Sequence, residues 1–462
     1  MAISWTAHSG PGPNRAEGRA GSSTGWYPVA RSVEVGTTPV PVGAAGQAYV
    51  VVRMCPGAEV TALSARCPHR LAPLTTATVV DGRLQCSYHG WQFNAEGRCV
   101  EIPSLGAEGT PPTRADLTAP WAVEERDGWI WIAPDRTPHA RPPRTGDTAP
   151  VPEPVPAPPA PAGPVFGNLG PALERAWHPV ALAGELRNGG YVQVRLLGRN
   201  WTVHRRDGRL DADPPAWGVL ERHGVIWIAP AEPRDDLLDV PEATDPGFTA
   251  AWLPPVRSVA PAGLLADNFL DVAHFPFVHA GTFGATDERE VPAYEVSTEP
   301  GGFRSVQEQW FDNPADPGVA SGERPVRQRR RATYVYRAPF QLLLRLEELD
   351  SGARKTVLFL LQPEDADSTR IYTCLLLHRI GGAEVLTADV LAAETAFEEA
   401  VLAEDLAQQA GMASAGLPLL LRDELHVRAD RLGVALRRTL ADLAADSAAA
   451  DQALALQRRA TG

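Results

Sequence analysis

The sequence predicts an α+β protein in which β-rich modules precede a sheet covered by helices. Residues 25–136 contain short β-type runs, such as "AYVVVRM" and "GWIWIAP", broken by Gly, Pro and Asp. Strand-like segments return at 331–349 and 355–380. Two helical stretches, 384–411 and 417–446, then close the chain. Runs of strands followed by helices are typical of this fold class.

Composition sets the limits of the possible functions. A chain of 462 residues with 44% apolar residues is long enough for two or three domains with their own cores. Asp and Glu number 56 against 43 Lys and Arg, and this acidic balance disfavours binding to nucleic acids or anionic membranes. Without a run of eighteen apolar residues, no transmembrane helix is predicted. Five cysteines are too few for a disulfide scaffold, which fits a reducing cytoplasm.

The chain divides at changes of composition. Eleven of the 28 residues in 137–164 are proline, so we expect this segment to be an extended, semi-rigid spacer. The N-terminus lacks both the basic start and the apolar run of a signal peptide, and we expect a flexible leader there. The predicted organisation is a leader at 1–24, a β-domain at 25–136, the spacer at 137–164, a second β-segment at 165–245, an α+β domain at 246–447 and a tail at 448–462.

The second β-segment repeats the ends of the first. "GWYPVARSVEVG" at 25–36 is echoed by "AWHPVALAGELR" at 176–187. "ERDGWIWIAPDRTP" at 125–138 is echoed by "ERHGVIWIAPAEPR" at 221–234. About ninety residues separate the two motifs in the first copy and about thirty in the second, which contains no cysteine. We interpret the pattern as an internal repeat whose second copy has lost its middle.

The middle of the first copy carries a candidate metal site. Two tight pairs, Cys67-x-His69 and Cys86-x-x-His89, are separated by sixteen residues. Zinc is one alternative, but one Cys and one His in each pair is unusual for a zinc finger. A [2Fe–2S] cluster of the Rieske type needs two thiolates on one iron and two imidazoles on the other, which is the set that two such loops supply.

A second candidate site lies in "DNFLDVAHFPFVH", residues 267–279, which we expect to be helical. Asp271 and His274 are three residues apart and would share a helix face, with His279 turning back after a distortion at Pro276. A non-haem Fe(II) site needs two histidines and one carboxylate on one face of the metal.

The missing carboxylate could come from the helical stretch "AAETAFEEAVLAEDLAQQAGM". Asp405 continues the stripe of Phe397 and Val401, so it would point towards a core, where an ionised carboxylate needs a partner or a metal. The alternative is an ordinary acid on the helix surface. We expect the neighbouring acids to form a solvated face; these are Glu398, Glu399 and Glu404.

At these motifs the sequence resembles a known family. "CPHRLAPL…CSYHGWQFNAEGRCVEIPS" is similar to the Rieske domain of the Rieske non-haem iron oxygenases, the α-subunits of aromatic ring-hydroxylating oxygenases. "DNFLDVAHFPFVH" resembles their Asp-x-x-His-x4-His motif, and "AEDLAQQ" their late helix. Leu71 stands where many members have glycine. The resemblance implies a [2Fe–2S] cluster on Cys67, His69, Cys86 and His89, a mononuclear Fe(II) on His274, His279 and Asp405, and a bridging role for Asp271.

The resemblance also implies the architecture and the reaction. It predicts an all-β Rieske domain and a catalytic domain of the helix-grip type, and the internal repeat adds a truncated Rieske-like β-segment without cluster ligands. The expected enzyme oxidises an apolar or aromatic small molecule with O₂. Electrons would come from an NAD(P)H-dependent reductase, with or without a ferredoxin. In the family, Asp271 would connect neighbouring subunits of a homotrimer.

Three questions stay open at this point. A desaturase or oxidative cyclase of the same family would have the same metal sites. A Rieske redox carrier with an inactive catalytic domain is a further alternative. The cluster could also serve the iron of its own chain or that of a neighbour, because a 28-residue spacer permits either.

Overall fold

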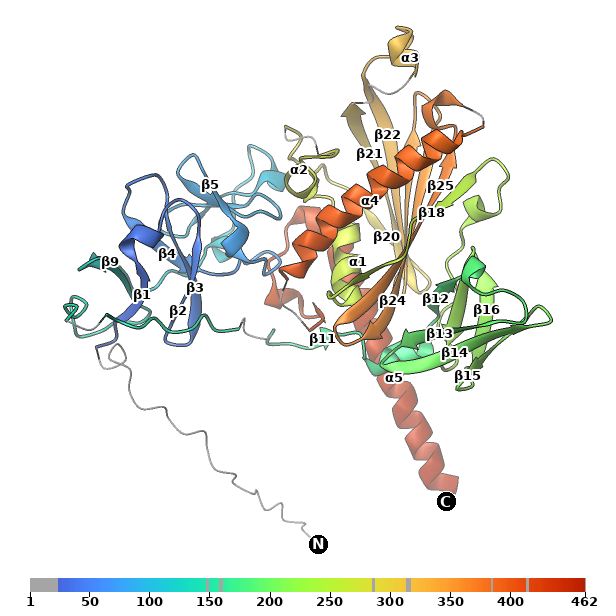
Figure 1. The fold of residues 1–462 in the computed structure, drawn as a ribbon, viewed down its shortest axis with the longest axis horizontal. Coiled ribbons are helices and arrows are strands. Elements are labelled where there is room, and N and C mark those ends of the chain that lie inside the picture. The colour runs from blue at the N-terminus through green and yellow to red at the C-terminus, as the bar shows by residue number, and fades with distance from the viewer. Residues whose placement is uncertain are drawn as a thin grey trace.

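The computed structural model describes residues 24–461 except 147–148, 158–160, 285–286, 313–316, 384 and 413–414. The predicted leader lies outside the described residues apart from Thr24. Figure 1 shows a β-rich N-terminal part, a large central sheet with helices and a smaller β-rich part on another side of that sheet. The predicted α+β class is confirmed. No helix within the described residues is both long and apolar enough to cross a membrane.

The N-terminal part consists of three small antiparallel sheets with the orders β1-β10-β9, β2-β3-β4 and β5-β6-β7-β8. Consecutive residues of β3 and β10 are buried, so both faces of these strands pack against the rest of this part. The strands are β1 Tyr27–Arg31, β2 Val40–Ala44, β3 Gln47–Arg53, β4 Val60–Ser64, β5 Thr78–Val80, β6 Arg83–Gln85, β7 Gln92–Phe93, β8 Cys99–Glu101, β9 Ala122–Arg126 and β10 Trp129–Ala133.

The second β-rich part repeats two of these sheets, as β12-β17-β16 and β13-β14-β15. The register of β1 on β10 slips between Pro28 and Ala30, and that of β12 on β17 slips between Pro179 and Ala181. Residues 214–217 stand where the first copy has 65–121, so the counterpart of the four-stranded sheet is missing. The strands are β12 His178–Leu182, β13 Tyr191–Leu196, β14 Arg199–Arg206, β15 Arg209–Asp213, β16 Gly218–Arg222 and β17 Val225–Ala229.

The central sheet is antiparallel, with the order β18-β25-β24-β23-β22-β21-β20, and β19 also pairs with β25. Its strands are β18 Thr249–Trp252, β19 Val256–Ser258, β20 Val296–Glu299, β21 Gly302–Asp312, β22 Arg327–Arg337, β23 Gln341–Glu348, β24 Arg354–Asp365 and β25 Ser368–His378. The helices are α1 Ala262–Leu270, α2 Phe275–Val278, α3 Pro317–Ala320, α4 Ala388–Ala410 and α5 Arg431–Thr461, and β11 Val165–Phe166 pairs with β26 Leu417–Pro418. Leucines of α1 and α5 share one core with the sheet and with the second β-rich part.

Two predicted helices have other boundaries in the structure. The stretch 267–279 is not one helix, because α1 ends at Leu270 and Asp271 has an extended backbone. The Asp271 carboxylate accepts the Ala273 N–H at 2.7 Å in place of a helical hydrogen bond, and Pro276 has no N–H to continue the helix. The stretch 417–446 begins as strand and loop, and α5 starts only at Arg431 and continues past 447.

Candidate metal centres and the contact between them

The first centre is formed by two loops of the N-terminal part. Cys67 and His69 lie between β4 and β5, and Cys86 and His89 lie between β6 and β7. All four side chains are buried. The Nδ1 atoms of the two imidazoles face each other at 3.1 Å, while both Nε2 atoms point away to carboxylates. Trp91 stacks on His69 with the ring centroids 4.6 Å apart and covers this side of the site.

This donor set fits a Rieske cluster. Two thiols and two imidazoles converge in a buried space, and the outer nitrogens are already occupied, which leaves one nitrogen of each ring for a metal. Burial and the neighbouring Cys86 sulfur raise the pKa of Cys67 well above its ordinary value. The hydrogen bond from Cys67 lowers the pKa of Cys86, so one thiolate of the pair is favoured and the second would be stabilised by bound iron.

The second centre brings together the three side chains that the sequence predicted. The Nε2 atoms of His274 and His279 are 3.1 Å apart, and Asp405 Oδ1 lies 3.4 Å and 3.3 Å from them. The three ligand atoms lie within 4.8 Å of one another. Both histidines belong to the segment around α2, and Asp405 comes from the facing side of α4.

The charges of this centre fit a divalent metal. Asp405 Oδ1 is buried and has no hydrogen-bond partner among the described residues, although it faces both imidazoles. Burial alone would lower the pKa of His274, but Asp271 and Asp405 raise it to about 9. Burial would raise the pKa of Asp405, but His274 and His279 hold it well below its ordinary value. A metal ion bound by two histidines and one carboxylate would satisfy all three groups.

Two predictions for the neighbouring acids are wrong. Glu398 is largely buried and pairs with Lys355 at 3.1 Å. Glu404 does not belong to a solvated face, because its Oε2 lies 2.7 Å from His279 Nδ1 and accepts the Thr282 hydroxyl at 2.9 Å. This carboxylate orients the imidazole so that Nε2 faces Asp405. The helix period missed this contact, because Glu404 lies off the stripe formed by Phe397, Val401 and Asp405.

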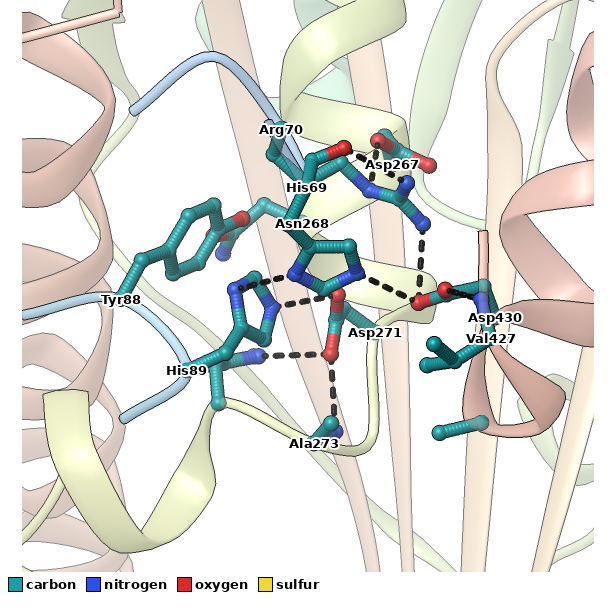
Figure 2. Close-up of polar contacts among 12 residues, drawn as sticks. His69, Arg70, Tyr88, His89, Asp267, Asn268, Asp271, Ala273, Val427 and Asp430 are labelled. Carbon is teal, nitrogen blue, oxygen red and sulfur yellow. Dashed lines mark hydrogen bonds and ion pairs between the residues drawn. The ribbon is translucent and has the colours of Figure 1, made fainter. Parts of the chain in front are cut away.

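Asp271 contacts one histidine of each centre, and Figure 2 shows its contact with His89. Its Oδ2 is 2.8 Å from His89 Nε2, and its Oδ1 is 3.6 Å from His274 Nδ1. Burial would raise the pKa of Asp271, but His89 and His274 hold it well below its ordinary value. A single ionised carboxylate therefore contacts one histidine of each centre.

The other cluster histidine has a carboxylate of its own, which the sequence did not reveal. His69 Nε2 lies 3.0 Å from Asp430 Oδ1 (Figure 2). Asp430 immediately precedes α5, and its Oδ2 also accepts the Val427 N–H. Since 361 residues separate it from His69, no local pattern could have indicated this contact.

Beside the second centre lies a small cavity of about 40 Å³ between α1, α4 and the sheet. Its apolar lining consists of Leu265, Phe269, Phe359, Val401, Leu402 and Leu406. Asp405 also lines it, so the cavity opens on the candidate metal ligands. Thr373 on β25 contributes a buried hydroxyl with no hydrogen-bond partner within the part of the chain described.

This hydroxyl leads to a stability prediction. We expect Thr373→Val to raise the free energy of unfolding by about 1 kcal/mol, because a methyl group of the same shape removes an unsatisfied buried donor. Thr369→Val on the same strand is the matched control, since the Thr369 hydroxyl donates to the Ala260 carbonyl at 2.9 Å. The control should lose about 1–3 kcal/mol in urea unfolding. Equal losses in both variants would mean that the Thr373 hydroxyl is satisfied.

Known proteins resemble both parts that carry the centres. The Rieske [2Fe-2S] domain family matches residues 25–116, and the Vanillate O-demethylase oxygenase C-terminal domain family matches residues 259–446. The probable methylxanthine N7-demethylase NdmC of Pseudomonas sp. (strain TJI-51) is 28% identical over 276 residues, which cover 58% of this chain and 93% of that protein.

Two further proteins align with almost the whole chain. Methylxanthine N1-demethylase NdmA of Pseudomonas putida is 23% identical over 424 residues, 90% of this chain and 88% of that protein. The crystal structure of dicamba monooxygenase bound to 3,6-dichlorosalicylic acid aligns with 92% of this chain and 98% of its own, at 17% identity and a TM-score of 0.41.

Proposed function

Because the chain belongs to the Rieske non-haem iron oxygenases, we propose that it oxidises a small aromatic molecule with O₂ in the cavity beside His274, His279 and Asp405. The Rieske domain implies a [2Fe–2S] cluster, and the catalytic domain of this family uses a mononuclear iron. In our proposal Cys67, Cys86, His69 and His89 hold the cluster, and His274, His279 and Asp405 hold the iron.

When bound, the cluster supplies electrons one at a time and the mononuclear iron binds and activates O₂. The side chains of the protein bind the substrate and orient the metal ligands. Most side chains that line the cavity are apolar and favour an apolar substrate next to Asp405. The Thr373 hydroxyl offers one hydrogen bond to a polar group of that substrate. Glu404 orients His279, and the Asp271 carboxylate lies beside His274 Nδ1 at 3.6 Å.

A narrower form of the reaction is oxidative demethylation. It is favoured by the match of residues 259–446 to a vanillate O-demethylase domain, together with the likeness to two methylxanthine demethylases. One oxygen atom of O₂ would enter a C–H bond of a methyl group on oxygen or nitrogen, and the other would leave as water. The hydroxymethyl product then releases formaldehyde and leaves O–H or N–H. Each turnover consumes two electrons and two protons, which NADH and one proton supply through a reductase.

Members of the family need a reductase and electrons from NAD(P)H. A ferredoxin between the reductase and the cluster, a homotrimeric assembly and a cytoplasmic location are further expectations from the resemblance. None of these three is needed for the reaction above.

The observation that carries the proposal is the Asp271 carboxylate, which contacts one histidine of each centre. We expect about three irons and two acid-labile sulfides per chain after anaerobic reconstitution of the wild type. The His274→Ala variant should retain two irons and an unchanged EPR signal of the reduced cluster, but should not oxidise substrate. Glu399→Gln, at an exposed position of α4, is the matched control and should keep all three irons.

Three outcomes would separate the alternatives. Two irons in the wild type would indicate a redox carrier. Zinc in place of iron at the first centre would contradict the proposal altogether. With ¹⁸O₂, label in the hydroxylated product or in released formaldehyde supports oxygen insertion, whereas an oxidised product without label indicates a desaturase or cyclase.

A further inference from the structure

We propose that this enzyme accepts an aromatic acid and that Arg330 binds the carboxylate of that substrate. The inference rests on the proposed function and narrows the class of substrate. Arg330 is a cation of the central sheet held by neutral groups, and two side chains near it are hydrogen-bond donors without an acceptor. We call Gln307, Arg330 and Tyr334 the donor cluster. Such a cluster suits a carboxylate, which has two charged oxygens and no proton to donate.

The donor cluster lies on the face of the central sheet that the helices cover. Side chains two residues apart on a strand share a face. Ala332 and Tyr334, which continue the series from Arg330 along β22, belong to the core that the sheet shares with α1 and α5. Gln307 on β21 pairs directly with Ala332 and therefore points the same way. The three members of the cluster thus flank the small side chain of Ala332.

Tyr334 connects the donor cluster with the metal centres. Burial raises the pKa of the Tyr334 hydroxyl, Arg330 lowers it and Asp271 raises it. The phenol is therefore within electrostatic reach of the guanidinium on one side and of the Asp271 carboxylate, beside His274, on the other. A substrate that extends from the metal site to Arg330 has its reactive carbon and its carboxylate at opposite ends of the molecule.

Arg330 itself is held by neutral groups. With the amide oxygen of Gln309 turned towards it, that oxygen accepts from Nε at 2.8 Å and from Nη2 at 3.0 Å. The Phe311 ring lies 5.0 Å from the guanidinium carbon. Burial lowers the pKa of Arg330, and no carboxylate among the described residues forms an ion pair with it. A guanidinium has more N–H donors than Gln309 occupies, so the others can bind a ligand.

Two acids near Arg330 have other partners. Glu348 lies opposite Arg330 in the register of β22 and β23, and its carboxylate accepts the Ser351 hydroxyl. Glu288 forms an ion pair with Arg327. Both carboxylates raise the pKa of Arg330, but burial outweighs them. Within the described part of the chain, no direct contact with an acid neutralises the charge of Arg330.

Lys355 is a cation on the same face of the sheet that does have acidic partners. It lies on β24, and the strand register places it in one row with Leu346 and Ala332. Its ammonium group is 3.2 Å from Glu394 and 3.1 Å from Glu398, both on α4. A buried charge is costly without a partner. The carboxylate of the substrate would give Arg330 the partner that α4 gives Lys355.

The other two members of the donor cluster also lack acceptors. The side-chain nitrogen of Gln307 is buried and has no hydrogen-bond partner among the residues that the structure describes. The Tyr334 hydroxyl is buried with its ring, and only burial and charges act on its pKa. Buried polar groups are nearly always hydrogen-bonded, and an unsatisfied one points to a bound ion or ligand. A carboxylate next to Arg330 would accept from both.

The test measures binding of three acids by equilibrium dialysis against the oxidised, iron-loaded protein. The probes are benzoate, 4-methoxybenzoate and 4-methoxycinnamate, each compared with its own methyl ester. We expect the wild type to bind at least one acid more tightly than its ester. Arg330→Gln should weaken binding of that acid by roughly 10- to 100-fold, because a hydrogen bond to a charged group is lost. Binding of the ester should stay the same.

Matched variants separate this role from a general effect of charge. Arg331→Gln removes the same charge from the same strand, but Arg331 points to the other face and pairs with Glu308 at 3.1 Å. It should bind the acid as the wild type does. Arg330→Lys keeps the charge and should restore part of the affinity. If the acid is oxidised, Arg330→Gln should raise its KM by the same factor and leave kcat unchanged.

Each outcome decides between the alternatives. Equal binding of every acid and its ester by the wild type would overturn the proposal, as would an equal loss in Arg330→Gln and Arg331→Gln. If Arg330 only stabilises the sheet, Arg330→Gln unfolds at lower urea concentration but keeps its preference for the acid. Should Arg330→Gln not fold, Tyr334→Phe and Gln307→Leu still decide, because both should weaken binding of the acid alone. Missing iron, or failure to oxidise any acid or ester, would instead contradict the proposed function.

Discussion

Replacing Asp271 with asparagine is expected to lower substrate oxidation by roughly two orders of magnitude while both metal centres stay loaded. The carboxylate accepts from His89 at one oxygen and from the Ala273 N–H at the other, next to His274. An amide of the same size has only one acceptor oxygen. Its NH₂ group must face a donor on one side, and the negative charge between the two histidines is lost.

The measurement has to separate electron delivery from metal loss. Product formation in the steady state and the rate at which O₂ reoxidises the reduced cluster should both fall in Asp271→Asn. Iron and sulfide contents should match those of the wild type. Glu399→Gln again serves as the control, with unchanged rates. If O₂ reoxidises the reduced cluster of Asp271→Asn at the wild-type rate, this carboxylate does not connect the two centres.

Replacing Arg437 with methionine is expected to lower the free energy of unfolding by about 3–5 kcal/mol. Arg437 is completely buried on α5 and forms two hydrogen bonds to Asp267, at 2.6 and 2.8 Å, and one to Glu424 at 2.9 Å. Methionine fills a similar volume, but it removes the cation that pairs with the buried carboxylates of Asp267 and Glu424. Arg70 is then the cation that remains near them. Stability is lost because two buried carboxylates no longer have their partner, not because a cavity forms.

Urea unfolding followed by fluorescence measures this loss. Arg206→Met is the matched control, because the Arg206–Asp211 pair at 3.1 Å is exposed, and removing it should change stability by less than about 1 kcal/mol. Adding Asp267→Asn to Arg437→Met should restore part of the stability, since one stranded charge is neutralised. If Arg437→Met unfolds at the same urea concentration as Arg206→Met, the buried network is not ionised as described.

The residues of both centres could be predicted because each group of ligands is local. Cys67 and His69 lie on one loop, Cys86 and His89 on another, and His274 and His279 flank a single short helix. Asp405 lies far from the two histidines in sequence, and it was predicted from the helical periodicity of its segment together with the family resemblance. Ligands that are a few residues apart stay close in space even where the local backbone differs from the prediction, as it does at Asp271.

The connection between the centres could not be predicted for the opposite reason. Asp430 meets His69 across 361 residues, and Tyr88 meets Gln409 across 321 residues. Such pairs depend on how whole domains pack, which no periodicity encodes. The start of α5 was placed too early because the apolar run at 417–425 resembles a helix, although Leu425 packs against the Rieske domain core instead.

The proline-rich spacer is held at both ends, because Glu153 forms a β-bridge with Gly43 and the Gly163 N–H donates to Asp423 at 3.0 Å. A tether of about ten residues keeps the two parts of one chain at a mutual effective concentration in the millimolar range, whatever the number of molecules in solution. The two parts of a chain therefore stay within reach of each other on dilution, even if the contact between them opens.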